Sequence, residues 1–403
     1  MKIPLVDIEA ARARIQGIVH RTPLSPSASA SDLVGADVHL KLENLQRTGS
    51  FKVRGAANRI LTLPDDARRK GVVAASAGNH AQGVALAARS AGIPSWIVMP
   101  KGAPLAKAEA VRGYGAILEL HGRDYNEAES RAFEIQKDTG AAFVHAFDDA
   151  AVIAGQGTIG LEIVEDLPDV DTVVVAIGGG GLISGIASAV KELRPRTRVV
   201  GVVPDGAASL PLSLRKGEIV TIERTQTIAD GLATRRVGRT PFDIIRANVD
   251  EVAVVTDDDI AAAILFLLER AKNVVEGAGA AALAALLAGK VRVRDGEKIA
   301  VVVSGGNIDV NLLDTIIQRG LAMSGRRLRL ATVLPDRPGA LADLLALVAD
   351  VGANIHGVEH DRGRVDVSIG QAEVALDLDT RGPAHVDEVL GALKAHGYPV
   401  RRL

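Results

Sequence analysis

The chain has 403 residues, 47% hydrophobic and 24% charged, with a formal net charge of −2. This composition is typical of a soluble globular protein of roughly two or three domains, and the near-neutral charge argues against a nucleic-acid or anionic-membrane partner. There is no cysteine, which excludes a disulfide framework and a Cys-based zinc site. The N-terminus lacks an apolar run typical of a signal peptide, and the Ala-rich stretch 277–289 is too short to cross a bilayer. We therefore expect a cytoplasmic location.

Most of the chain alternates between short apolar segments and helical patterns. The patterns predict strands over 38–42, 72–75, 96–99, 116–120, 172–177, 198–203 and 298–303. They predict helices over 7–15, 51–61, 80–91, 105–112, 124–138, 159–165, 182–193 and 257–271. In the helix over 159–165, we expect residues 155–158 to form the N-terminal cap. Strands that alternate with helices indicate an α/β fold with a parallel sheet and right-handed crossovers.

A basic segment at 326–329 precedes a smaller unit. Strands are predicted over 328–334, 353–360, 371–379 and 400–403, with helices over 340–350 and 385–396. The order βαββαβ is that of a ferredoxin-like α/β sandwich. We therefore predict two domains, 1–325 and 328–403. A tail of this kind could serve oligomerisation alone.

Lys52 is the first candidate for chemistry. It follows a Thr-Gly turn, and apolar Phe51 and Val53 flank it. Most lysines are solvated surface charges, but a desolvated ammonium loses its proton more easily, which suits a lysine that forms a Schiff base.

Four consecutive glycines, Gly178, Gly179, Gly180 and Gly181, follow a buried strand and open a helix. Free backbone N–H groups at a helix start bind phosphate, and glycines remove every Cβ that could block it. The alternative is a tight strand-to-helix turn, which needs fewer glycines. The spacing is not that of a dinucleotide fold, and no Walker lysine follows.

Two further polar stretches also end predicted strands. The loop of Ser76, Ala77, Gly78, Asn79 and His80 could hold a carboxylate on its free N–H groups, although it could equally be a plain helix cap. His80 by itself is more typical of a structural residue.

The end of the last predicted strand carries Ser304, ahead of two glycines. Parallel sheets place ligands at the carboxyl ends of their strands, so one cleft can hold the lysine, the anion loop and these polar groups. A phosphorylated aldehyde matches that set, and pyridoxal 5′-phosphate fits it as an electron sink.

Five motifs in this order resemble the threonine dehydratases (threonine ammonia-lyases), which are pyridoxal-phosphate enzymes of fold type II. The motifs lie at 50–56, 77–83, 178–182, 276–281 and 304–307, and the resemblance covers about residues 5–320. It implies a two-lobed catalytic unit whose smaller lobe spans about 47–148. The tail resembles an ACT domain, a regulatory module, through its Asp336-Arg337-Pro338-Gly339 turn and the step at 352–355.

The resemblance also implies roles for single residues. Lys52 would be the Schiff-base lysine and would take the substrate α-proton. Phe51 would pack near the cofactor ring, Asn79 would bond the ring 3′-oxygen, and Ser304 would meet the pyridine nitrogen. The phosphate would be held by Gly178, Gly179, Gly180, Gly181 and Leu182. The substrate carboxylate would be held by Ser76, Ala77, Gly78, Asn79 and His80.

The implied reaction is the elimination of water from L-threonine, giving 2-oxobutanoate and ammonia, the first step toward isoleucine. Alternatives are an L-serine-preferring dehydratase of the same fold and a non-catalytic amino-acid-sensing protein. Serine racemases have a serine where this chain has Ala77, which has no proton to give, so the resemblance argues against racemisation.

Relatives with a divalent-ion site carry carboxylates after the strand that ends here at Val203, and the side chains of Val203, Ala207 and Ser209 cannot reproduce that site, so we expect no metal. The alternative is a monovalent ion bound by backbone carbonyls. We expect a homo-oligomer, either a dimer or a tetramer, with an ACT domain that binds an amino-acid effector such as isoleucine or valine.

Overall fold

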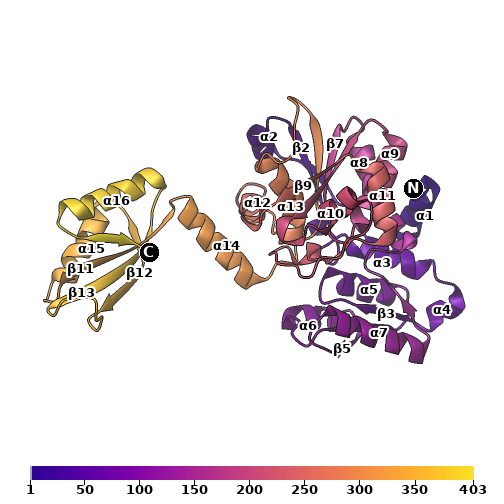
Figure 1. Cartoon of the computed structure of the whole chain (residues 1–403), viewed down its shortest axis with the longest axis horizontal. Coiled ribbons are helices and arrows are strands. Elements are labelled where there is room, and N and C mark those ends of the chain that lie inside the picture. The colour runs from indigo at the N-terminus through magenta and orange to yellow at the C-terminus, as the bar shows by residue number, and fades with distance from the viewer. Residues whose placement is uncertain (1) are drawn as a thin grey trace. The chain divides into compact units, whose positions relative to one another are not determined.

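Two parallel sheets and one antiparallel sheet form the framework of the computed structural model, which describes residues 2–403 apart from the side chain of Ala106 (Figure 1). The chain divides into two units, one that ends at Asp309 and one that spans Val310–Leu403. The predicted fold class is confirmed, with a parallel α/β unit followed by a βαββαβ unit. The predicted boundary at 325–328 stays a prediction, and Met1 lies outside the described residues.

The larger parallel sheet has six strands in the order β1-β2-β10-β7-β8-β9. Only β1 is antiparallel to its neighbour. Every residue of the central strand β7 is buried, as expected for a strand covered on both faces. The strands are β1 (Leu24–Pro26), β2 (Asp37–Leu42), β7 (Thr172–Ala176), β8 (Arg198–Pro204), β9 (Glu251–Val255) and β10 (Lys298–Val303).

Helices pack around this sheet, and Ala-rich α13 contacts β7, β8, β9 and β10 directly. The helices of this lobe are α1 (Leu5–Ile15), α2 (Ala28–Val34), α8 (Ala150–Asp166), α9 (Gly181–Leu193), α10 (Ser209–Lys216), α11 (Arg239–Asn248), α12 (Asp257–Glu269) and α13 (Gly277–Leu287). Three 3₁₀ turns are η1 (Glu43–Leu45), η2 (Asp205–Ala207) and η3 (Asp230–Leu232).

Helix α8 corrects one prediction. The expected cap at 155–158 lies inside a continuous helix, whose real N-cap is Asp149. Gly155 and Gly157 allow α8 to pack closely on its neighbours. A Cβ on Gly155 would lie 2.6 Å from the Arg54 carbonyl oxygen, and a Cβ on Gly157 would lie 3.0 Å from the Gly185 carbonyl oxygen. Small residues at these points let α8 approach both α3 and α9.

The smaller lobe is a four-stranded parallel sheet in the order β5-β4-β3-β6. Alternate residues of β3 face opposite sides, with Val72 and Ala74 packed in the core under α5 and Val73 and Ala75 in the core under α7 (Figure 1). The strands are β3 (Val72–Ala75), β4 (Ser95–Met99), β5 (Ile117–Leu120) and β6 (Ala142–Phe143). The helices are α3 (Lys52–Leu61), α4 (Asp65–Arg69), α5 (Asn79–Ser90), α6 (Leu105–Gly113) and α7 (Tyr125–Thr139).

A buried ionic cluster fixes the first turn of α3. The Arg54 guanidinium donates to Glu43 Oε1 at 2.8 Å and to Glu162 Oε1 at 2.6 Å, and Lys41 Nζ lies 2.6 Å from Glu162 Oε2. All four side chains are at most 6% exposed. Two cations and two carboxylates balance, which is the condition under which buried charges are tolerated.

The second unit has an antiparallel sheet in the order β12-β13-β11-β14, and its helices α15 and α16 share a core with that sheet. Its elements are α14 (Val310–Met323), β11 (Arg327–Pro335), α15 (Ala340–Asp350), β12 (Asn354–Asp361), β13 (Gln371–Asp379), α16 (Pro383–Ala395) and β14 (Val400–Arg402).

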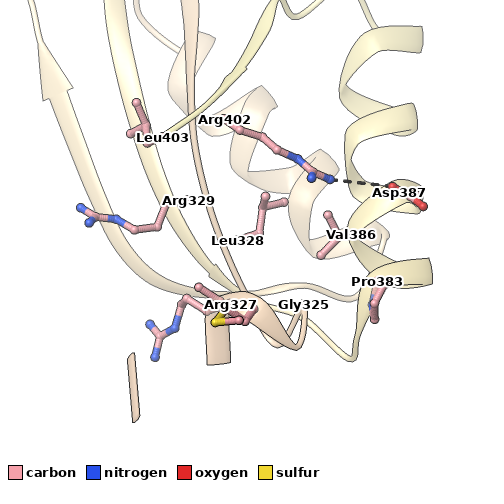
Figure 2. Close-up of a pocket in the computed structure, with 11 residues that line it drawn as sticks. Gly325, Arg327, Leu328, Arg329, Pro383, Val386, Asp387, Arg402 and Leu403 are labelled. Carbon is pink, nitrogen blue, oxygen red and sulfur yellow. Dashed lines mark ion pairs between the residues drawn. The ribbon is translucent and has the colours of Figure 1, made fainter. Parts of the chain in front are cut away.

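A cavity of about 330 Å³ lies in this unit, between the start of β11, α16 and β14. Figure 2 shows Arg402 directed toward Asp387, with 3.8 Å between their charged atoms, while Arg329 points away. Leu328 and Val386 add apolar surface to the lining. The cavity therefore combines a cation, an anion and apolar side chains.

Candidate active site

Lys52 is the first residue of α3 and is partly buried. Its Nζ donates to the carbonyl oxygen of Ala146 at 3.1 Å and lies 5.1 Å from the centroid of the Phe51 ring. Burial lowers the pKa of Lys52 to about 8, and the negative charge of Glu276 opposes that shift. The amine is thus much closer to neutral at physiological pH than a surface lysine, as a nucleophilic lysine requires.

The loop that follows β6 connects this lysine to the four glycines. Ala146 accepts the Lys52 hydrogen bond, and the ring of the next residue, Phe147, packs on the glycine loop. A Cβ on Gly179 would lie 2.3 Å from that ring, and one on Gly181 would lie 2.9 Å from the Phe147 carbonyl oxygen. The lysine and the glycines are therefore neighbours in space, joined by residues 146 and 147.

The glycine loop presents unused donors. Among the described residues, no acceptor is found for the backbone N–H groups from Gly178 to Leu182, although most of this loop is buried. Gly180 adopts φ +93°, a conformation that favours glycine. Buried N–H groups without a partner are rare in proteins, so these groups at the N-terminus of α9 form a site suited to an anion such as phosphate.

Ser304 lies beside the lysine turn. Its carbonyl oxygen accepts from the Phe51 N–H at 3.2 Å, and Ser50 pairs with Gly305 in an isolated bridge. The Ser304 hydroxyl is buried and donates to the Ala278 carbonyl oxygen at 3.2 Å. The hydroxyl of Ser50 is also buried and has no partner among the described residues.

Residues 76–78 connect β3 to α5 as predicted, and Asn79 and His80 begin the helix. The Ser76 hydroxyl accepts from the Gly78 N–H at 3.1 Å, so it caps the loop. The N–H groups of Ala77, Asn79 and His80 have no acceptor among the described residues. They could bind a carboxylate, because α5 begins at Asn79.

His80 is buried in the first turn of α5, and one of its ring nitrogens is hydrogen-bonded to the backbone. Its Nε2 lies 2.8 Å from the Val144 carbonyl oxygen, so that nitrogen must carry the proton and donate. Burial, with the nearby Lys52 charge, lowers the pKa of His80 to about 3. The imidazole is therefore neutral at physiological pH.

The depressed pKa of Lys52 predicts a pH-dependent stability of the cofactor-free chain. A buried ammonium costs free energy of folding wherever the amine is charged, so the cost is complete below about pH 8 and fades as pH rises toward 10.5, the ordinary lysine pKa. We expect Lys52→Met to melt at a higher temperature than the wild type at pH 7. The difference should vanish near pH 10.5. Equal melting temperatures at pH 7 would contradict this account.

The donor set fits pyridoxal phosphate. The site offers a desolvated amine, a row of buried N–H donors for a phosphate, and two buried hydroxyls. Groups of three or more His, Asp or Glu side chains that could hold a metal ion are absent from residues 2–403 as far as they are described. In the same part of the chain, no helix is long and apolar enough to span a membrane.

Several residues of the cleft were given no role from the sequence. Ala146 acts through its carbonyl and Phe147 through its ring, and no local pattern points to either. Glu276 and Asn307 lie in two of the motifs that resemble those of the threonine dehydratases. Each forms a hydrogen bond with the Asn79 side chain, at 2.6 and 2.8 Å. A charged residue directly before an Ala-Gly helix was the available signal for Glu276.

Comparison with known proteins agrees with this geometry. Residues 15–305 match the family model of pyridoxal-phosphate dependent enzymes, and residues 329–395 match the ACT domain. The chain is 51% identical to the L-threonine ammonia-lyase of Thermotoga maritima over 399 residues, which cover 99% of each chain.

Solved structures are similar as well. Maize serine racemase matches with a TM-score of 0.75 and 40% identity, over 80% of this chain and 99% of that one. The processed threonine deaminase isoform 2 of Solanum lycopersicum matches with a TM-score of 0.74 and 39% identity, over 78% and 86% of the two chains.

Proposed function

This chain belongs to the family of pyridoxal-phosphate-dependent enzymes. We propose that it is a threonine ammonia-lyase that converts L-threonine to 2-oxobutanoate and ammonia. The observation that carries the proposal is the contact chain in which Lys52 binds Ala146 and Phe147 packs on the glycine loop. The L-threonine ammonia-lyase of Thermotoga maritima, 51% identical along nearly the whole chain, supports the choice of substrate.

We assign the residues to the cofactor as follows. Lys52 would hold the aldehyde carbon through its ε-amine, and Phe51 would pack beside the ring. The N–H groups of the loop from Gly178 to Leu182 would bind the phosphate, and Asn79 would bond the ring hydroxyl. The Ser304 hydroxyl, which here donates to the Ala278 carbonyl oxygen, would turn to donate to the pyridine nitrogen instead. A neutral hydroxyl at that nitrogen does not force it to be protonated, unlike a carboxylate.

Pyridoxal phosphate, when bound, supplies an electron sink for the charge left at the substrate Cα. The N–H groups of Ala77, Asn79 and His80 would hold the substrate carboxylate, with Ser76 and Gly78 shaping that loop. The ε-amine of Lys52 would take up the Cα proton. The departing β-hydroxyl would accept that proton from Lys52 and leave as water, and hydrolysis of the resulting enamine would give the 2-oxo acid and ammonia.

The substrate test compares purified enzyme on L-threonine and L-serine. We expect 2-oxobutanoate from L-threonine with a higher kcat/KM than pyruvate from L-serine. A serine-preferring enzyme would reverse that ratio, and a non-catalytic sensor would release neither 2-oxo acid. Racemisation is not proposed, since the methyl side chain of Ala77 cannot donate a proton to the second face of the substrate.

We further propose that the second unit binds a small amino acid that adjusts activity. The match of residues 329–395 to an ACT domain supports this role. The cavity of Figure 2 is our candidate for the ligand, because Arg402 and Asp387 complement the carboxylate and amine of an amino acid. We expect isoleucine or valine to change the rate of the full chain but not that of a chain lacking residues 328–403. An unchanged response in the shortened chain would contradict the proposal.

As an enzyme that would begin isoleucine synthesis, it is expected to act in the cytoplasm, where its amino-acid substrate is available. A dimer or tetramer stays a prediction, and so does the absence of a metal.

A further inference from the structure

Glu276 is a carboxyl group at the edge of the cleft to which the chemistry above assigns no task. It is the N-cap residue of α13, yet its side chain makes no capping hydrogen bond. Instead, Oε1 accepts from Asn79 Nδ2 at 2.6 Å. A Cβ on Gly305 would lie 2.2 Å from the same oxygen, so the glycine after Ser304 leaves the room that this carboxyl occupies.

The Asn79 amide is fixed from both ends. Its Oδ1 accepts from Asn307 Nδ2 at 2.8 Å, and that nitrogen also donates to the Thr48 carbonyl oxygen at 2.8 Å. A carbonyl can only accept, so Asn307 must present its NH₂ group to both partners. The oxygen of Asn79 therefore faces Asn307, its nitrogen faces Glu276, and one of its two amide hydrogens stays unused by these partners.

We propose that Glu276 is a positioning residue: by accepting one Asn79 N–H, it holds the other toward the ring oxygen of the cofactor. The inference rests on the proposed function, because that function places the cofactor beside Asn79. Four segments meet in this network, namely the turn before Lys52, the start of α5, the N-cap of α13 and the loop after β10. Loss of the Glu276 acceptor would leave the Asn79 amide held only at its oxygen end, by Asn307, and its nitrogen end less firmly oriented.

The charges around Glu276 do not alter which atom accepts. Burial raises the pKa of Glu276 to about 7, the Asn79 hydrogen bond and the charges of Lys107 and Lys52 lower it, and that of Asp230 raises it. Whether the carboxyl is ionised or protonated, one oxygen remains an acceptor for Asn79, and the carbonyl of a glutamine could take its place. Hydrogen bonding rather than net charge is therefore the property to test.

The experiment is a double-mutant cycle that measures the dissociation constant of pyridoxal phosphate, by titrating cofactor-free protein and following visible absorption. We expect Glu276→Ala and Asn79→Ala each to weaken binding about tenfold, the order of one hydrogen bond to a charged group. The double variant should be no weaker than Asn79→Ala alone, because the two residues act as one unit. Glu276→Gln should bind within about twofold of the wild type, since it keeps the acceptor.

Glu297→Gln is the matched control, because Glu297 is a buried carboxyl that accepts from Thr172 and is not part of the cleft network. Its cofactor affinity should equal that of the wild type. If Glu276→Ala does not fold, Glu276→Asp replaces it in the double-mutant cycle. The aspartate side chain is one methylene shorter, which moves the carboxylate out of hydrogen-bond reach of Asn79. Effects that multiply to about a hundredfold would overturn the inference, as would unchanged affinity in Glu276→Ala. A wild type that takes up no cofactor would instead refute the proposed function.

Discussion

Lys52→Ala should lower the release of 2-oxobutanoate from L-threonine by roughly 10⁴-fold, because the same amine holds the cofactor and moves the substrate proton. The variant should also lose the visible absorption band of the lysine-bound cofactor. Lys52 contacts Ala146, whereas the ring that packs on the glycine loop is that of Phe147. Truncation of Lys52 should therefore leave the phosphate site intact.

Lys137→Ala is the matched control for this experiment, since Lys137 is an exposed lysine on α7. It should retain full activity and the full absorption band. A Lys52→Ala enzyme that kept more than about a tenth of the wild-type rate would be incompatible with general-base catalysis by this lysine.

Arg54→Met should lower the free energy of unfolding more than the loss of any exposed ion pair. Removal of the guanidinium leaves the Glu43 and Glu162 carboxylates buried with only Lys41 as a counter-charge. Breaking a buried pair in this way costs about 3–5 kcal/mol of the free energy of unfolding. The measurement is urea unfolding followed by the fluorescence of Trp96, the single tryptophan, which lies in β4 of the same unit.

Arg123→Met provides the comparison, because Arg123 forms an exposed ion pair with Glu127. Pairs of that kind contribute at most about 1 kcal/mol. If Arg54→Met cost no more than Arg123→Met, the buried cluster would not be the element that holds α3 in place.

The hydrophobic pattern of the sequence was sufficient to predict the bounds of helices and strands that are buried in a regular way. The bounds of β3, β10, α15 and β13 agree with the prediction to the residue. The three missed strands lack such a signal. β1 has three residues and pairs antiparallel at the edge, β6 has only two residues, and β9 is an edge strand with a partly exposed face. In α8 the glycines were interpreted as a cap because close helix packing depends on partners distant in sequence.

The candidate site was predictable to the extent that topology determines it. Parallel strands bring their carboxyl ends together, so the loops after β3, β7 and β10 could be placed in one cleft from the sequence. The contacts that complete the cleft could not be predicted from the sequence. The Ala146 carbonyl and the Phe147 ring act on residues far away in the chain, and Asn307 acts through Asn79. Such pairings follow from packing and leave no local pattern.

Reductive trapping identifies the lysine that holds the cofactor. The enzyme loaded with pyridoxal phosphate is treated with borohydride, digested, and mapped by mass spectrometry. We predict one phosphopyridoxyl adduct, on the peptide that contains Lys52. An adduct on a different lysine, or none in protein that has taken up the cofactor, would contradict it.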